Sequence, residues 1–233
     1  MTDEEYLKAK SKVEIYCEIL LGILRYVPLK KTSSQLAYES EIIKKLKFQS
    51  FKEVNLLRAC IDILEDTQYA IDETFKNGLE IKNGNTGERY LRLYGVLNAY
   101  YQQMFSLFNL IKIFQLTNQD EIKSRFKNLQ IINLRNKIAS HTTNYVDDFK
   151  KKKDFDFFRV TQTTLTKWSW NLVIVSFKSK HEEVNLINLM NDFTNNLEIE
   201  LHRICEKGIN SIFRTDSESK TWLLFRLNYI YKK

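Results

Sequence analysis

The chain has few residues that interrupt helices. Its 233 residues include one proline, Pro28, and six glycines. Proline and glycine disfavour helix interiors, and a many-stranded β fold needs frequent turns, so this scarcity favours long helices over a β-sandwich or barrel. Hydrophobic residues make up 43% of the chain and aromatic residues 13%. These fractions are typical of a folded chain that buries a core.

Long apolar runs are also missing. The first residues are charged, so no signal peptide is predicted, and no run approaches the length of a membrane span. The three cysteines, Cys17, Cys60 and Cys205, are odd in number, widely spaced and set among apolar neighbours. We therefore expect reduced, buried thiols rather than disulfides or a metal site, in a cytoplasmic protein that makes no membrane contact.

The net charge is +7, with a pI near 9.1. This balance is compatible with a polyanionic partner such as RNA. It is equally compatible with an ordinary lysine-rich surface, and charge alone does not separate these two readings.

Apolar residues recur with helical spacing over most of the chain. A capping box formed by Thr2 and Glu5 predicts the start of a helix that runs to about Tyr26. Further helices are predicted over residues 40–47, 51–77, 88–116, 119–138, 182–213 and 216–231.

Residues 155–178 have a different texture, because they are rich in Val, Thr, Phe and Trp. That composition predicts a β-hairpin or small sheet inserted into a helical domain. Trp168 and Trp170 alternate along this segment and would share one face of a strand, in the core or at an interface. The predicted fold is mainly α: a multi-helix bundle forming a single domain over residues 1–233, with the β insertion at about 155–178.

Four tyrosines lie in the strongly aromatic segment 88–116, namely Tyr90, Tyr94, Tyr100 and Tyr101. They could form a platform on which bases stack. Aromatic residues at helical spacing are more commonly core, so we interpret this segment as the central helix of the bundle.

The segment Arg135-Asn136-Lys137-Ile138-Ala139-Ser140-His141 carries most of the chemistry in the sequence. Arg135 is a permanent cation with paired donors for phosphoryl oxygens, and an imidazole such as that of His141 can exchange a proton near neutral pH. Asn136 could orient the imidazole or an attacking hydroxyl. Together these groups could hold a phosphodiester while a 2′-hydroxyl attacks it.

This segment resembles the motif of the HEPN superfamily, which consists of small α-helical bundles. The hallmark of that family is Arg, a polar residue, then His after a spacer of four to six residues; here Arg135 and Asn136 precede His141. The resemblance covers residues 50–145 loosely, and only the seven-residue segment is specific. It implies a metal-independent endoribonuclease without a cofactor, often a homodimer, found among toxins with an antitoxin partner or among antiphage-defence effectors.

In that reading Arg135, Asn136 and His141 are the catalytic residues, and cleavage leaves a 2′,3′-cyclic phosphate. Lysines nearby could hold flanking phosphates. These predicted RNA-binding residues are Lys137, Lys150, Lys151, Lys152 and Lys153.

A uniform α-helix would not bring the two charged groups together. Six positions correspond to about 600° of rotation, so Arg135 and His141 would point about 120° apart. They converge only if the helix ends near Ser140, or if a second subunit completes the site. Some family members carry a modified tyrosine two residues after the histidine; Thr143 occupies that position here, and Tyr145 comes two residues later.

An alternative to the catalytic interpretation stays open. Arginine and histidine near a helix C-terminus are favoured by the helix dipole alone, so the segment could be structural. The chain would then be a non-catalytic helical module that binds RNA or a protein. The other histidines are interpreted as structural, with His181 capping a helix or solvated and His202 packed within one.

Overall fold

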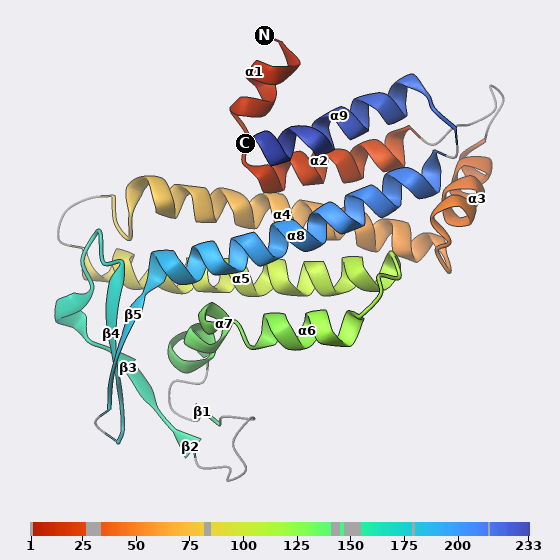
Figure 1. The fold of residues 1–233 in the computed structure, drawn as a ribbon. Helices are drawn as coiled ribbons and strands as arrows, with labels where there is room; N and C mark the ends of the chain where they lie inside the picture. Colours follow the sequence, from red (N-terminus) through yellow and green to blue (C-terminus); the bar gives the residue numbers. More distant parts are fainter. Residues whose placement is uncertain are drawn as a thin grey trace. The chain divides into compact units, whose positions relative to one another are not determined.

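The structure is a computed structural model that describes residues 2–26, 34–81, 85–140, 145–146, 155–178, 180–213 and 215–233. Its fold is mainly α with a small antiparallel sheet, as predicted (Figure 1). The helices are α1 (Asp3–Lys8), α2 (Lys12–Arg25), α3 (Gln35–Leu46), α4 (Phe51–Asn77), α5 (Thr86–Ile113), α6 (Gln119–Lys127), α7 (Gln130–Arg135), α8 (Leu186–Ile212) and α9 (Glu218–Lys232). Among the described residues, no helix is both long and apolar enough to cross a membrane.

The remaining elements are short. A π-helical turn, η1 (Asn136–Ser140), continues α7, and a 3-10 turn, η2 (Gln162–Thr164), precedes β4. The strands are β1 (Tyr145–Val146), β2 (Phe155–Asp156), β3 (Phe158–Val160), β4 (Asn171–Ser176) and β5 (His181–Asn185). β1 pairs with β2, and β3, β4 and β5 form a three-stranded antiparallel sheet in that order.

The first predicted helix is in fact two helices. Thr2 and Glu5 form the predicted capping box, but α1 ends at Lys8. Ser11 and Glu14 then form a second capping box, in which each side chain accepts a hydrogen bond from the other residue's backbone amide. This second cap satisfies the free amides at the start of α2, so the chain can begin a new helix there without losing hydrogen bonds.

Three other predicted boundaries differ from the structure. Helix α3 begins at Gln35, five residues early, because the Ser34 side chain caps it. The helix predicted over 119–138 is divided between α6 and α7 at Asn128 and Leu129, and ends in the π-turn. Residues 182–185, predicted as helix, belong to β5 and pair with β4.

The tryptophan segment is a turn rather than a strand. Trp168 and Trp170 lie between η2 and β4, with ring centres 6.0 Å apart. Their proximity was predicted for a strand, but it arises here from a turn in which the Trp170 amide donates to the Trp168 carbonyl. Trp168 is half exposed, so it is not a core residue.

The chain forms two compact units. Unit 1 comprises residues 1–68, 103–121 and 196–233, and unit 2 comprises residues 69–102 and 122–195. The divisions fall within helices α4, α5, α6 and α8.

In unit 1, helices α2 and α9 pack side by side (Figure 1). Gly22 allows the close approach, because a Cβ atom at that position would lie 2.6 Å from Cδ2 of Leu223. The three cysteine thiols are free and buried in this unit, as predicted. Burial raises the pKa of Cys60 to about 11, and it raises the pKa values of Cys17 and Cys205 well above 9.

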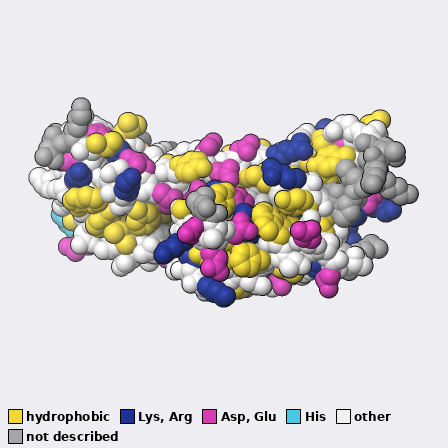
Figure 2. Space-filling view, turned by 90° about the horizontal axis from the view of Figure 1, so that it is seen from above, with side chains coloured by type: hydrophobic (Ala, Val, Ile, Leu, Met, Phe, Trp, Pro, Cys, Tyr) yellow, Lys and Arg dark blue, Asp and Glu magenta, His cyan; other side chains and the backbone are white. Residues whose placement is uncertain are grey.

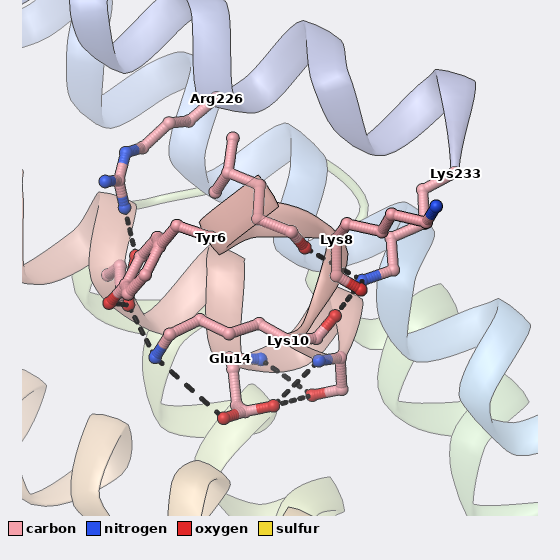
Figure 3. A network of polar contacts seen from close by, with 9 residues as sticks. Tyr6, Lys8, Lys10, Glu14, Arg226 and Lys233 are labelled. Atoms are coloured by element: carbon pink, nitrogen blue, oxygen red, sulfur yellow. Dashed lines mark hydrogen bonds and ion pairs between the residues drawn. The ribbon is translucent and has the colours of Figure 1, made fainter. Parts of the chain in front are cut away.

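A half-buried ionic network joins α9 to α1 and α2 in the same unit (Figure 3). The Glu18 carboxylate accepts hydrogen bonds from the Tyr6 hydroxyl (2.6 Å) and from Arg226, and it forms an ion pair with Lys10 at 2.7 Å. The Arg226 guanidinium also lies 3.8 Å from the centre of the Trp222 ring. Burial alone would raise the pKa of Glu18, but the donors and positive charges outweigh it and the pKa is lowered.

In unit 2, aromatic rings and one face of the sheet form the core. The Phe193 ring lies 4.9 Å from that of Tyr100 and 5.4 Å from that of Phe126. The buried face of the sheet consists of Val160, Leu172, Ile174 and Val184. These residues alternate with exposed or half-exposed ones along each strand, which leaves the opposite face accessible.

Candidate functional site

The Arg135 segment lies at a local change of helix geometry in unit 2. Helix α7 is anchored by the buried side chains of Ile131, Ile132 and Leu134, and the π-turn η1 is anchored by the buried Ile138. A π-turn is wider than an α-turn and occurs frequently at functional sites. Because each residue of a wider turn rotates less, the angle of about 120° predicted for a uniform α-helix does not apply beyond Arg135.

Arg135 is held by two neighbours. Its Cζ lies 3.8 Å from the centre of the Tyr101 ring, and its Nη1 donates a hydrogen bond of 3.1 Å to Oδ1 of Asn136. Its Nε is buried, and no acceptor among the described residues binds it. Two of the three predicted catalytic residues are therefore in contact, with the guanidinium fixed by an aromatic face.

Lys137 has partners of its own. Its Nζ lies 2.6 Å from Oε2 of Glu182 on β5 and 5.1 Å from the centre of the Phe158 ring on β3. Both contacts join η1 to the sheet. A phosphate at Lys137 would have to compete with the Glu182 carboxylate.

The remaining predicted residues lie outside the described part of the chain. These are His141, Thr143 and the run Lys150, Lys151, Lys152 and Lys153. His141 follows Ser140, the last residue of η1, directly in the sequence. The described segment therefore fixes Arg135 and Asn136 and ends immediately before the predicted acid–base residue.

A groove of ≈ 940 Å³ borders the same segment. Ile138 of η1 lines it, together with Tyr90 and Tyr94 of α5. Residues 157–162 supply another side of the groove, and β4 and β5 contribute Val175 and His181. The groove thus follows β3, one of the two outer strands of the three-stranded sheet, and lies wholly within unit 2.

The register of the sheet aligns two polar groups of the groove. Arg159 pairs with Val175, which pairs in turn with His181. Directly opposed residues of an antiparallel sheet point to the same face, so Arg159 and His181 share the accessible face, two strands or roughly 10 Å apart. Both side chains are exposed.

Arg159 is not among the residues predicted from the sequence, and His181 is predicted there only as a cap or a solvated residue. The alternation of Phe157, Arg159 and Thr161 is a strand signal that places these side chains on one face. His181 could be placed beside Arg159 only by the pairing of β4 with β5, which the sequence predicted as the start of a helix.

The tyrosines of α5 divide between core and surface. Tyr100 is fully buried, as predicted for the central helix of a bundle, and Tyr101 packs against Arg135. Tyr94 is 39% exposed to solvent, so the prediction that it is a core residue is wrong. Its ring centre lies 5.7 Å from that of Tyr90. This pair forms an aromatic wall of the groove.

Charges of both signs are mixed on one face of the molecule. On the face seen in Figure 2, Lys and Arg side chains are interspersed with Asp and Glu. In the part of the chain that the structure describes, no cluster of three or more His, Cys, Asp or Glu side chains is arranged to hold a metal ion.

A second pocket, of ≈ 400 Å³, lies in unit 1 beside the Glu18 network. Its lining includes Glu18, Arg226, Trp222 and Glu65. Burial raises the pKa of Glu65. His202, also in unit 1, packs between the rings of Tyr16 and Tyr231, as predicted for a structural histidine.

Comparison with models of protein families, with curated proteins and with solved structures gave no match.

Proposed function

We propose that this protein is a metal-independent endoribonuclease of the HEPN type. Arg135 and Asn136, joined by a hydrogen bond at a π-turn that ends immediately before His141, carry this proposal. A site that cleaves RNA without metal needs a cation for the phosphoryl oxygens and a group that moves protons near neutral pH. The segment supplies both residue types within seven positions.

The proposed reaction is an in-line attack of a ribose 2′-oxygen on the adjacent phosphorus. The 2′-hydroxyl gives up its proton, the P–O5′ bond breaks, a 2′,3′-cyclic phosphate forms, and the departing 5′-oxygen takes up a proton. Arg135 stabilises the charge that develops on the phosphoryl oxygens. His141 removes the proton of the attacking 2′-hydroxyl or donates one to the departing 5′-oxygen. Asn136 positions Arg135 through its carboxamide.

RNA cleavage in excess chelator tests the assignment. We expect His141→Ala and Arg135→Ala to abolish cleavage by the purified protein, with Arg58→Ala, which removes an exposed arginine of unit 1, as the matched control. Thermal unfolding of each variant verifies that it is folded. Unchanged activity in both site variants would remove the assignment.

A 2′-O-methyl substrate tests the chemistry separately. Methylation removes the proposed nucleophile, so we expect no cleavage of the modified strand and a cyclic phosphate on the unmodified one. Hydrolysis of the methylated strand would require a water nucleophile and a different mechanism.

We further propose that the protein is a homodimer and serves as a toxin or antiphage-defence effector restrained by an antitoxin. This part rests on the family resemblance. Light scattering tests the oligomeric state. If the sites are composite, a mixture of the inactive Arg135→Ala and His141→Ala proteins will regain activity, whereas separate sites will give none.

The second candidate function is a non-catalytic helical module that binds RNA or a protein. It is favoured by the contacts of Arg135 with Tyr101 and of Lys137 with Glu182, which a purely structural segment would also make. Salt-dependent RNA binding without cleavage would support this module, and absence of RNA binding would point to a protein partner.

A further inference from the structure

The groove along β3 presents aromatic rings to solvent. The solvent-exposed fractions of Tyr94 and Phe157 are 39% and 38%. Phe177 is 67% exposed, and its ring centre lies 4.5 Å from that of Phe157. Large aromatic side chains are usually covered in a folded chain, and an exposed cluster of them at a groove indicates a surface that a partner covers.

A cation borders the same groove. Arg159 is exposed, and no carboxylate within the described ranges lies at ion-pair distance from its guanidinium. Arg89 and Lys137, by contrast, have carboxylate partners: Arg89 forms two hydrogen bonds with Glu80, and Lys137 pairs with Glu182. The Arg159 guanidinium is therefore available to an anion that enters the groove.

Exposed aromatic faces beside a cation match the chemistry of single-stranded nucleic acid. Bases stack on tyrosine and phenylalanine without regard to sequence, and arginine binds the phosphates between them. A duplex offers its base faces only to neighbouring bases, so a stacking groove selects unpaired strands. A peptide covering the same rings would have to bring a carboxylate for Arg159, whereas every nucleotide carries its own anion.

We infer that this groove binds single-stranded RNA, with bases stacked on Tyr94 and Phe157 and a phosphate held by Arg159. The inference deepens the proposed nuclease function, on which it rests for the choice of RNA, by naming unpaired strands as the substrate and the β3 groove as the site that holds them next to the Arg135 segment. Ile138, which lines the groove three residues after Arg135, connects the two.

The test is binding of a fluorescein-labelled 2′-O-methyl oligonucleotide of twelve residues, measured by anisotropy with the full chain. The probe cannot be cleaved by 2′-attack, so binding is measured independently of catalysis. Tyr94→Ala should weaken binding roughly 5- to 150-fold, the range found when a stacking aromatic is removed, whereas Tyr94→Phe should bind as the wild type does. Tyr69→Ala, which removes an exposed tyrosine of unit 2 outside the groove, should have no effect.

The role of Arg159 is read from the salt dependence. For single strands, each phosphate contact contributes about 0.7 to the slope of log affinity against log salt. Arg159→Gln should make the slope shallower by about that amount. Lys76→Gln, which removes an exposed positive charge elsewhere in unit 2, should leave the slope unchanged.

The outcomes separate the two proposals. Groove-dependent binding with no cleavage of natural RNA upholds the groove and overturns the nuclease. If Tyr94→Ala and Arg159→Gln both leave RNA cleavage unchanged, or both leave probe binding unchanged, the groove proposal is refuted. The nuclease proposal is not affected by either result. No binding of the probe by the wild-type protein also overturns the groove, as does equal affinity for the probe and for its pre-formed duplex.

Discussion

The guanidinium carbon of Arg135 lies 3.8 Å from the centre of the Tyr101 ring. This stacking fixes the predicted catalytic cation on a helix of unit 2 instead of leaving it to swing in solvent. It also means that Arg135 has a packing role that must be separated from any role in chemistry.

Arg135→Lys separates these roles. Lysine keeps the charge and can still lie over the ring, but it lacks the planar fork that binds two phosphoryl oxygens. We expect the free energy of unfolding to change by less than about 1 kcal/mol while RNA cleavage falls about 100-fold. Denaturant unfolding and single-turnover cleavage are the two measurements.

The companion variant is Tyr101→Leu. It removes the aromatic face and should lower the free energy of unfolding by about 1–2 kcal/mol, the scale of a partly desolvated cation–π contact. If Arg135→Lys lowers stability more than Tyr101→Leu does and leaves cleavage intact, Arg135 is structural.

Replacing each of two glycines of unit 2 by alanine should change the free energy of unfolding in opposite directions. Gly78 follows α4 with φ of 71°, and a Cβ atom there would clash with the Lys167 carbonyl oxygen. Gly95 lies within α5 with no atom within 4 Å of the added Cβ. Gly78→Ala should destabilise by about 2 kcal/mol or more, and Gly95→Ala should stabilise by about 0.4–1 kcal/mol. Thermal and denaturant unfolding would show both shifts; equal effects would contradict the assigned turn.

The Glu18 network predicts a stability loss in acid. A carboxyl whose pKa is lowered on folding stabilises the protein above its unfolded pKa, here 4.5, and the stabilisation is lost as the pH falls through the folded pKa. Glu18→Gln should cost about 3 kcal/mol at pH 7, because it leaves the buried Arg226 without its anion.

The difference between this variant and the wild type should shrink as the pH falls below 4.5, and urea unfolding at a series of pH values measures it. Asp66→Asn, which removes an exposed carboxylate of α4 in unit 1, is the control. A difference that stays constant down to pH 3 would show that the charge of Glu18 is not what stabilises the network.

His202 predicts a second pH dependence, at higher pH. Burial lowers its pKa below 6.5, although the nearby Glu206 acts in the opposite direction. The unfolded chain then binds the proton first, so stability decreases as the pH falls below 6.5 towards the folded pKa. His202→Phe keeps an aromatic ring between Tyr16 and Tyr231 and should flatten this dependence between pH 7 and 5. Identical slopes in the variant and the wild type would refute the prediction.

The sequence predicted elements where a local signal decides the structure. The Thr2 capping box, the stop of α4 at Asn77 and the cap of α9 at Ser217 are side-chain and backbone preferences that act within a few residues. The second capping box, of Ser11 and Glu14, was equally local, but the apolar period continued through it and concealed it.

The predictions failed where distant partners decide. Residues 182–185 have a helical apolar period, yet they pair with residues 171–174 of β4, and that pairing determines their conformation. The same pairing places His181 opposite Val175, which lies opposite Arg159, so that His181 and Arg159 share one face of the sheet. For the candidate site, the sequence identified the residues of the Arg135 segment, but not the π-turn, the Tyr101 contact or the groove, because each depends on packing between separate elements.

The side chain of Lys233, at the end of α9, binds the end of α1. Nζ of Lys233 donates hydrogen bonds to the carbonyl oxygens of Leu7, Lys8 and Lys10, which lie at the end of α1 and just after it (Figure 3). The Lys233 ammonium group therefore joins the end of α9 to α1, in addition to the Glu18 network. Fraying of the last turn of α9 would break these contacts and expose the end of α1 at the same time.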